Sequence, residues 1–188
     1  MLRILIYALL MHLLLTSCEP LPEDAQVRHF VVRKGEHYSK PRYVETLQAR
    51  KLVFEATFDE TAIYAFDDYY QDSNNKLLGF SDCNSEHHEN SARFGWMWLN
   101  DRLEIHAYCY ANGVRNTQFI GIATLNEPGR YEIEIKDSEY VFRFNDNPPV
   151  AMKRGDTCDR GVYYMLWPYF GGSMPAPHDV HVAIRVLH

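Results

Sequence analysis

Apolar and polar residues alternate with a period of two along most of the chain from about residue 29 onward. Such runs, rich in β-branched and aromatic residues and separated by turn residues, predict β-strands. No stretch carries a long apolar stripe at helical spacing, and in the least regular segment, Gly35 to Arg50, we expect a short helix or an irregular crossover. The expected strands are His29–Arg33, Lys51–Phe58, Lys76–Asp82, Ser91–Leu99, Arg102–Ala111, Gln118–Leu125, Tyr131–Lys136, Glu139–Phe144, Val162–Trp167 and Val180–Leu187. So many strands in 188 residues predict a single all-β domain, an antiparallel sandwich or a barrel.

The sharpest local prediction is a hairpin around Asn100-Asp101, two residues that separate two alternating runs. A two-residue turn fixes the register, so counting outward pairs Arg93 with Tyr108 and Gly95 with His106. Alternate pairs share a face. One face is an apolar core face made of Phe94, Trp96, Trp98, Leu103, Ile105, Ala107 and Cys109. The other face carries Arg93, Glu104, His106, Tyr108 and Tyr110 around Gly95 and Met97.

A second predicted hairpin, around Asp137-Ser138, serves as a comparison. Its apolar face carries Tyr131, Ile133, Ile135, Tyr140, Phe142 and Phe144. Its other face carries Glu132, Glu134, Val141 and Arg143, which is typical of a solvated surface without aromatic residues. The first hairpin differs because its polar face combines aromatic rings, a guanidinium and an imidazole.

The polar face of the first hairpin is therefore the first candidate ligand site. Aromatic rings stack on the apolar faces of sugars, and charged groups bond to hydroxyls or carboxylates. The candidate ligand-binding residues are Arg93, Glu104, His106, Tyr108 and Tyr110. An ordinary solvated sheet face, with Tyr filling positions that favour strands, is the competing interpretation.

Two loops are weaker candidates. The loop from Asp82 to Asn90 contains Glu86, His87, His88 and Glu89, but adjacent His residues in extended chain point to opposite sides and the spacing matches no zinc motif. We predict a polar loop and no metal site there, although the loop would contact ligand if it lies at the mouth of a groove. The segment Trp167–Gly172, followed by His178-Asp179, is more typical of packing at one end of a sandwich.

The first seventeen residues predict an export signal. Arg3 precedes an apolar stretch from Ile4 to Leu15 that is too short to span a bilayer as a helix but fits the apolar region of a signal peptide. The sequence Leu15-Thr16-Ser17-Cys18 resembles the bacterial lipobox, which implies lipidation of Cys18 after cleavage. We therefore expect a signal peptide at 1–17, a lipidated Cys and tether at 18–28, and one domain at 29–188.

Lipidation would hold the protein at a membrane, because two or more acyl chains anchor firmly. Removal of the signal peptide, with Arg3, changes the net charge from −6 to −7. The segment Glu19–Asp24 is a short acidic tether stiffened by two Pro residues, and acidic residues after the Cys resemble the surface-export signals of Bacteroidota lipoproteins. The expected location is the bacterial cell envelope, at the outer membrane or cell surface.

Beyond Cys18, three cysteines remain, so at most one disulfide forms within a monomer. An oxidising compartment permits such a bridge. We expect Cys83 to pair with Cys109, although a buried free thiol at any of the three positions is an equal alternative.

Composition narrows the function classes. The net charge of −6, from 25 acidic and 19 basic residues, argues against a nucleic-acid partner. The chain lacks a Gly-x-Ser-x-Gly elbow, a Gly-rich phosphate loop and a His-Glu-x-x-His motif, so no cofactor is expected. Glu132 and Glu134 share a face, but that face has no aromatic neighbours to hold a sugar for hydrolysis.

With its strand number, hairpin pattern and polar aromatic face, the region 29–188 resembles a concanavalin A-like jelly roll of the lectin and laminin-G type. The segments Gly79–Cys83, Asn90–Trp96 and Trp167–Gly172 resemble uncharacterised surface lipoproteins of Bacteroidota, a family that implies no established chemistry.

Arg93, Glu104-Ile105-His106 and the later Tyr163, Tyr164 and Tyr169 also resemble the sheet of jelly-roll alginate lyases. That resemblance implies an Arg that neutralises a uronate carboxylate and a His or Tyr that removes a proton, although Glu104 stands where those enzymes carry Gln. We therefore expect a glycan-binding envelope protein, with a polysaccharide lyase or a non-catalytic protein-interaction module as alternatives.

Overall fold

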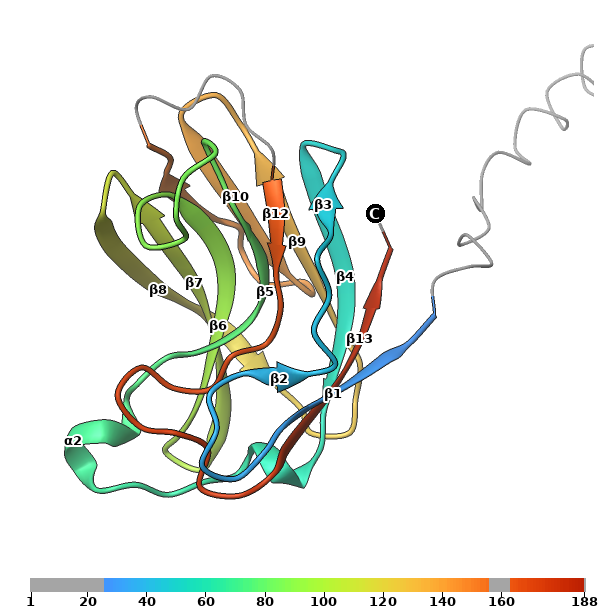
Figure 1. Ribbon diagram of the computed structural model, residues 1–188, viewed down its shortest axis with the longest axis vertical. Coiled ribbons are helices and arrows are strands. Elements are labelled where there is room, and N and C mark those ends of the chain that lie inside the picture. Colours follow the sequence, from blue (N-terminus) through green and yellow to red (C-terminus); the bar gives the residue numbers. More distant parts are fainter. Residues whose placement is uncertain (1–25, 156–162, 188) are drawn as a thin grey trace, which may run out of the picture.

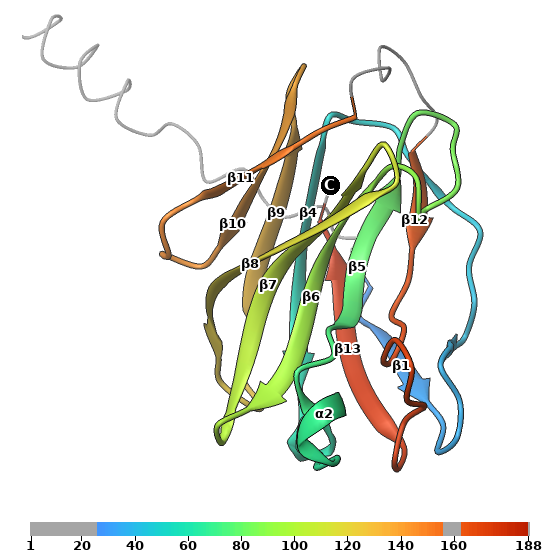
Figure 2. The ribbon, with the colours of Figure 1, turned by 90° about the vertical axis from the view of Figure 1, so that its left-hand side faces the viewer.

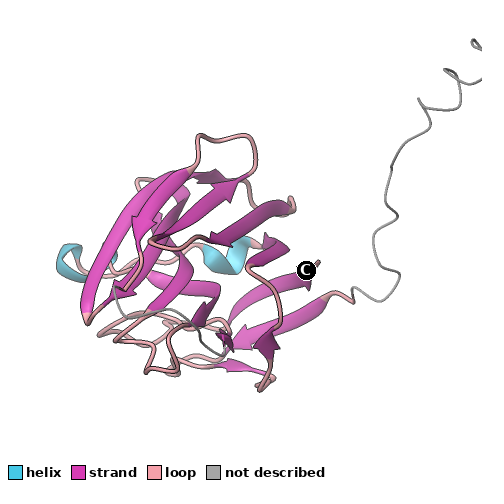
Figure 3. Cartoon of the chain, turned by 90° about the horizontal axis from the view of Figure 1, so that it is seen from above, coloured by secondary structure: helices cyan, strands magenta, loops and turns pink. Residues whose placement is uncertain are grey.

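The computed structural model describes residues 26–155 and 163–187. Strands dominate this part of the chain, and two short helices, the 3₁₀ helix η1 (Glu60–Ala62) and α2 (Asp68–Gln71), interrupt them (Figure 3). None of its helices is long and apolar enough to cross a membrane. The predicted signal peptide and Cys18 lie outside the described residues.

The described strands form two antiparallel sheets, so the predicted all-β sandwich is confirmed (Figure 1). The seven-stranded sheet has the order β11 (Val150–Lys153), β10 (Glu139–Phe144), β9 (Gly129–Ile135), β4 (Lys51–Phe58), β13 (Val180–Val186), β1 (Arg28–Val32) and β2 (Ser39–Lys40). The six-stranded sheet has the order β3 (Thr46–Leu47), β12 (Tyr163–Leu166), β5 (Asn75–Ser81), β6 (Ser91–Leu99), β7 (Arg102–Ala111) and β8 (Val114–Ala123). Strands β5 to β8 run side by side in Figure 2.

The core lies between the two sheets and is rich in aromatic rings. Phe54 on β4 stacks on Tyr131 of β9 with ring centroids 4.9 Å apart. Phe94 on β6 meets the edge of Tyr131 at 5.0 Å and of Phe142 at 5.1 Å, which ties the two sheets together. These side chains are fully buried, so the apolar faces predicted for both hairpins are the faces that pack inward.

Both predicted hairpins have the predicted register. In β6–β7 the structure pairs Arg93 with Tyr108 and Gly95 with His106 across the turn at Asn100-Asp101. In β9–β10 it pairs Phe142 with Ile133. On the outer face of that second hairpin Arg143 bonds to Glu132 and Glu134, as expected of a charged surface.

Other predictions need correction. Of the two alternatives for the segment 35–50, the short helix is wrong: the segment holds two two-residue strands, β2 and β3, in an otherwise irregular crossover. Strand β8 begins at Val114, earlier than predicted, because Asn112 and Gly113 (φ 52° and 77°) form a tight turn that pairs Ala111 with Val114. Strand β11 is missing from the expected strands, because it has only four residues, directly follows Pro148 and Pro149, and lies at the edge of its sheet.

The predicted disulfide between Cys83 and Cys109 is wrong. Cys109 is a buried free thiol on the core face of β7, where burial raises the pKa of the thiol well above its ordinary value. Cys83 is disulfide-bonded, but it lies in the turn after β5 and its partner is outside the described residues. The hairpin register places Cys109 on the core face, and the structure confirms that its side chain points between the sheets, away from Cys83 in the turn.

Candidate functional site

A cavity of about 520 Å³ opens on the outer face of the six-stranded sheet. Side chains of β5, β6, β7 and β8 form its floor, and the Asp82–Asn90 loop and the segments around β2 and β12 form its sides. We call this cavity the sheet pocket. Its size suits a small ligand or one unit of a larger one.

The strand register explains which side chains meet there. Arg93 on β6 lies opposite Tyr108 on β7, and Tyr110 lies opposite Arg115 on β8. On the other side of β6, Lys76 of β5 pairs with Gly95 and also bridges to Tyr169, which follows β12. Paired residues in antiparallel strands point to the same side, so all of these side chains project outward.

The predicted ligand-binding residues divide into two groups. Arg93, Tyr108 and Tyr110 line the sheet pocket. Glu104 and His106 are on the same sheet face but are not part of the pocket lining. The role of all five residues in ligand binding stays a prediction.

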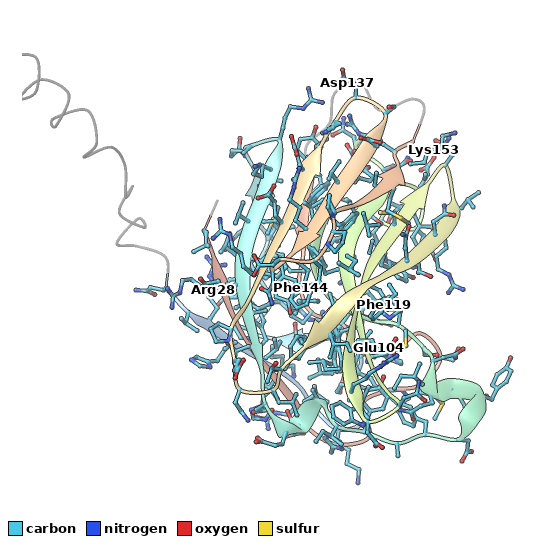
Figure 4. The ribbon with its side chains drawn as sticks, turned by 180° about the vertical axis from the view of Figure 1, so that it is seen from behind. Arg28, Glu104, Phe119, Asp137, Phe144 and Lys153 are labelled. Carbon is cyan, nitrogen blue, oxygen red and sulfur yellow. The ribbon has the colours of Figure 1, made fainter. Side chains whose placement is uncertain are left out.

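The Glu104 carboxylate is bonded to two neighbouring side chains, Arg102 and His106. Its Oε1 accepts hydrogen bonds from Nε and Nη2 of Arg102 at 2.9 and 2.7 Å, and its Oε2 lies 3.3 Å from Nε2 of His106. The His106 ring also meets the edge of Phe119 at 5.6 Å, and burial lowers the pKa of His106. Figure 4 labels Glu104 and Phe119 on this part of the sheet.

Arg93 is the most buried basic group in the sheet pocket, with 6% of its surface exposed. Its Nη2 donates to the Trp167 carbonyl oxygen at 2.8 Å, while its Nε has no partner in the described part of the chain. Burial lowers the pKa of Arg93 to about 10. Gly79 makes this placement possible, because a Cβ there would lie 2.5 Å from the Arg93 Cα and 2.8 Å from its Cγ.

Lys76 lines the same pocket and is half-buried. Its Nζ donates to the carbonyl oxygens of Asn74 at 2.9 Å and Gly171 at 2.8 Å. The Nζ also lies 5.0 Å from the ring centroid of Tyr108 and 5.6 Å from that of Tyr169. Burial, followed by the charges of Arg93 and Arg115, lowers the pKa of Lys76 to about 7.

Two segments that the sequence analysis ranked as weaker candidates than the hairpin face also line the pocket. His87 and His88, from the predicted polar loop, line the pocket with ring centroids 4.1 Å apart, and His88 meets Tyr110 at 5.3 Å. Trp167 and Tyr169 line it as well. Their aromatic character was visible in the sequence, but the pairings that bring them to β5 and β6 are long-range.

The remaining loop candidates have structural contacts. His178 Nε2 lies 2.9 Å from the Thr61 carbonyl oxygen, and Asp179 binds the Arg33 side chain and the Lys34 backbone N–H. Among the described residues, no group of three or more His, Cys, Asp or Glu side chains could hold a metal ion.

The charge of the sheet pocket is one-sided. Its described lining contains four basic residues, Arg42, Lys76, Arg93 and Arg115, and no Asp or Glu. None of these four forms an ion pair with a described carboxylate. Glycoside hydrolysis ordinarily needs two carboxyl groups at the scissile bond, which this lining does not supply.

The sequence matches no described protein family. It also matches no curated protein. Solved structures resemble it in fold at low sequence identity. One is the alginate lyase from Klebsiella pneumoniae, with a TM-score of 0.56 and 10% identity over 72% of this chain and 57% of that one. Another is the laminarinase catalytic domain from Thermotoga petrophila, with a TM-score of 0.56 and 10% identity over 85% of this chain and 76% of that one. A third is a glycoside hydrolase family 16 endo-glucanase from Bacteroides ovatus, with a TM-score of 0.53 and 8% identity over 88% of this chain and 83% of that one.

These likenesses establish the fold alone, a concanavalin A-like jelly roll, as the sequence predicted. The chain spans little more than half of the Klebsiella lyase. By their titles these neighbours are a lyase and two glucanases, which are enzymes that act on carbohydrates.

Proposed function

We propose that the protein is a lipid-anchored, extracytoplasmic module that binds a carbohydrate in the sheet pocket. The observation that carries the proposal is the pocket itself: aromatic rings and unpartnered hydrogen-bond donors line one cavity on a sandwich face. Tyr108, Tyr110 and Tyr169 offer rings for the apolar faces of sugars, and Arg93 offers donors for their oxygens. The fold of the neighbouring structures supports a glycan ligand.

The direct test is binding of the purified protein to an array of neutral and acidic glycans. We expect Tyr110→Ala to weaken binding about two- to tenfold, since loss of a stacked aromatic ring removes roughly 0.5–1.5 kcal/mol. Arg93→Ala should weaken it further. The matched control is Arg143→Ala, on the outer face of the opposite sheet, which should bind like the native protein. Thermal unfolding of each variant verifies folding.

Binding that survives both pocket substitutions would contradict the proposal. Absence of binding across the whole array would also contradict it, and would favour the alternative of an envelope protein-interaction module.

A polysaccharide lyase is the enzymatic alternative, in which Arg93 neutralises a uronate and His106 and a Tyr exchange protons. The position of His106 makes this assignment less favourable, because its Nε2 faces Glu104 and its side chain is not part of the pocket lining. Incubation with uronate polymers, followed by ultraviolet absorbance of an unsaturated product, separates the two. Product formation that is lost in His106→Ala would favour the lyase.

The membrane anchor is a separate part of the proposal and rests on the lipobox-like sequence before Cys18. Expression in a bacterial host with a radiolabelled fatty acid should label the native protein and place it in the membrane fraction. Cys18→Ala should abolish both. Equal labelling of native and variant protein would contradict lipidation at Cys18.

A further inference from the structure

Two basic residues of the sheet pocket, the buried Arg93 and the half-buried Lys76, have no described carboxylate to balance them. Buried charges in proteins are ordinarily paired or lose their charge, because burial without compensation is costly. Arg93 and Lys76 both contribute to the lining, and neither forms an ion pair with a described acidic side chain. The compensating charge is therefore missing from the protein side of the site.

Unpartnered donors mark the same place. Five buried side-chain atoms in the described part of the chain have no hydrogen-bond partner, and two of them, Arg93 Nε and Trp167 Nε1, belong to residues that line this pocket. Both atoms are donors, so both require an acceptor. A guanidinium donor beside a second cation is the ordinary way to hold a carboxylate or a sulfate.

Lys76 differs from Arg93 because a ligand can change the protonation state of a lysine but not that of an arginine. A guanidinium stays protonated in proteins, whereas a buried lysine readily loses its proton. The charged and titratable groups that face Lys76 are Arg93 on β6, Tyr108 on β7, Arg115 on β8, Tyr169 after β12 and His87 in the loop after β5. None of these groups is acidic near neutral pH, so an unliganded pocket favours the neutral amine.

We propose that the sheet pocket takes the acidic group of a glycan, a carboxylate or a sulfate, between Arg93 and Lys76, and that Lys76 gains a proton as the ligand binds. This inference rests on the proposed carbohydrate function and specifies its ligand class. An anion beside Lys76 stabilises the ammonium form, and the ammonium form in turn strengthens the hold on the anion. Proton uptake and acid selectivity are then two consequences of one contact.

The sign of the pH effect follows from the protonation of Lys76. Burial and the neighbouring Arg93 and Arg115 lower its pKa to about 7, so the free protein carries the proton below that pH and lacks it above. The acidic ligand should bind tightly below pH 7. Above pH 7 the affinity should fall toward about tenfold per pH unit, because each binding event must then take one proton from solution.

Isothermal titration calorimetry on the purified protein tests both the preference for an acidic ligand and the proton uptake by Lys76. The probes are three oligosaccharides of equal length: an oligouronate, a sulfated oligosaccharide and a neutral gluco-oligosaccharide. We expect one of the two acidic probes to bind at least about tenfold more tightly than the neutral one at pH 6.5. Titrations in buffers of different ionisation enthalpy should show nearly no proton uptake at pH 6 and close to one proton at pH 8.5.

Two substitutions assign the proton to Lys76. Lys76→Arg keeps a permanent positive charge, so it should retain the preference for the acid and lose the proton uptake at pH 8.5. Lys76→Met should bind the acid weakly at every pH. His87→Gln is the matched control for a second titratable base in the lining, whose pKa burial lowers. It should leave the loss of affinity above pH 7 in place.

The possible failures are distinguishable. A neutral probe that binds as tightly as both acidic ones overturns the inference and leaves carbohydrate binding intact. An acid-selective affinity without proton uptake at pH 8.5, or an uptake that disappears in His87→Gln, overturns the role of Lys76. If no probe binds and the glycan array is also empty, the proposed function itself fails.

Discussion

Asp82 shows how a single residue can hold several segments together. Its carboxylate is fully buried at the end of β5 and accepts a hydrogen bond from the Tyr140 hydroxyl at 2.6 Å. The Arg154 side chain, 2% exposed, donates to the same carboxylate through Nε at 2.7 Å and Nη2 at 3.2 Å. Burial, and then the charge of Asp82, raise the pKa of Tyr140. These contacts connect the six-stranded sheet to β10 and to the chain after β11.

Asp82→Asn is therefore expected to lower the free energy of unfolding by about 3–5 kcal/mol, because it leaves the buried Arg154 guanidinium without its carboxylate. Tyr140→Phe removes only one hydrogen bond and should cost about 1–2 kcal/mol. Urea unfolding followed by Trp fluorescence measures both. If Asp82→Asn were no more destabilising than Tyr140→Phe, the ion pair would not be the main contribution of this residue.

Among the elements, the β6–β7 hairpin is the one whose geometry follows most directly from local sequence. Asn100 and Asp101 both have positive φ values, 52° and 56°, which is the backbone of a type I′ turn. Asn adopts this conformation readily, Asp less so, and Gly without steric cost. The turn therefore sets the register of β6 and β7 while its second residue remains strained.

Asp101→Gly should stabilise the protein by roughly 0.5–1 kcal/mol, since Gly relieves the left-handed backbone at a surface position. Asp101→Val should destabilise it, because a β-branched residue is disfavoured there. Urea unfolding midpoints of the two variants, compared with the native protein, provide the measurement. An order of stability with Val above Gly would contradict this account of the turn.

The same hairpin shows which residues of the candidate site can be predicted from the sequence. Counting from Asn100-Asp101 places Arg93, Tyr108 and Tyr110 on one face, because a two-residue turn leaves one register. Counting cannot bring Lys76 or Tyr169 beside them, since those neighbours depend on the pairing of β5 with β6 and on a bridge between distant segments. Counting also puts Arg102 on the same face as Glu104, and the ion pair between them draws Glu104 away from the pocket lining.

Short and edge elements were the least predictable part of the fold for a related reason. Strands β2 and β3 have two residues each and pair only at sheet edges, so they carry no periodic pattern of their own. The first residues of β8, from Val114 to Phe119, are exposed and mostly polar because β8 is also an edge strand. A strand shows alternating apolar and polar residues because one of its faces is buried. Edge strands bury less of that face, so their alternation is weaker.

Across the whole molecule, charge is distributed unevenly. The chain has a formal net charge of −6, yet the described lining of the sheet pocket holds basic residues and no acidic ones. On the outer face of the opposite sheet, Glu132 and Glu134 are instead balanced by Arg143. The uncompensated bases thus gather on one side, where they raise the local concentration of anionic ligands and weaken the unliganded fold.

This arrangement predicts how stability depends on pH. The pKa of Lys76 is about 7 in the folded protein against an ordinary 10.5. Between these two values the unfolded chain binds the proton and the folded protein does not, so the free energy of unfolding should rise with pH. Below pH 7 both states are protonated and the cost of the buried ammonium is fully present. The upper limit of the window is about pH 10, because Tyr64 and Tyr108 have pKa values raised to about 12 and lower the stability once unfolded tyrosines ionise.

Urea unfolding at pH 7, 8, 9 and 10 measures this dependence, with Lys76→Met as the variant that lacks the titrating group. We expect the native protein to gain stability relative to the variant as the pH rises, and the variant to be the more stable of the two at pH 7. Burial lowers the pKa of His87, which moves its titration further away from this range. Parallel curves for the two proteins would show that Lys76 stays protonated in the folded state. The folding and binding experiments therefore test one property of the pocket in opposite directions: high pH favours the empty fold, and low pH favours the complex with an acid.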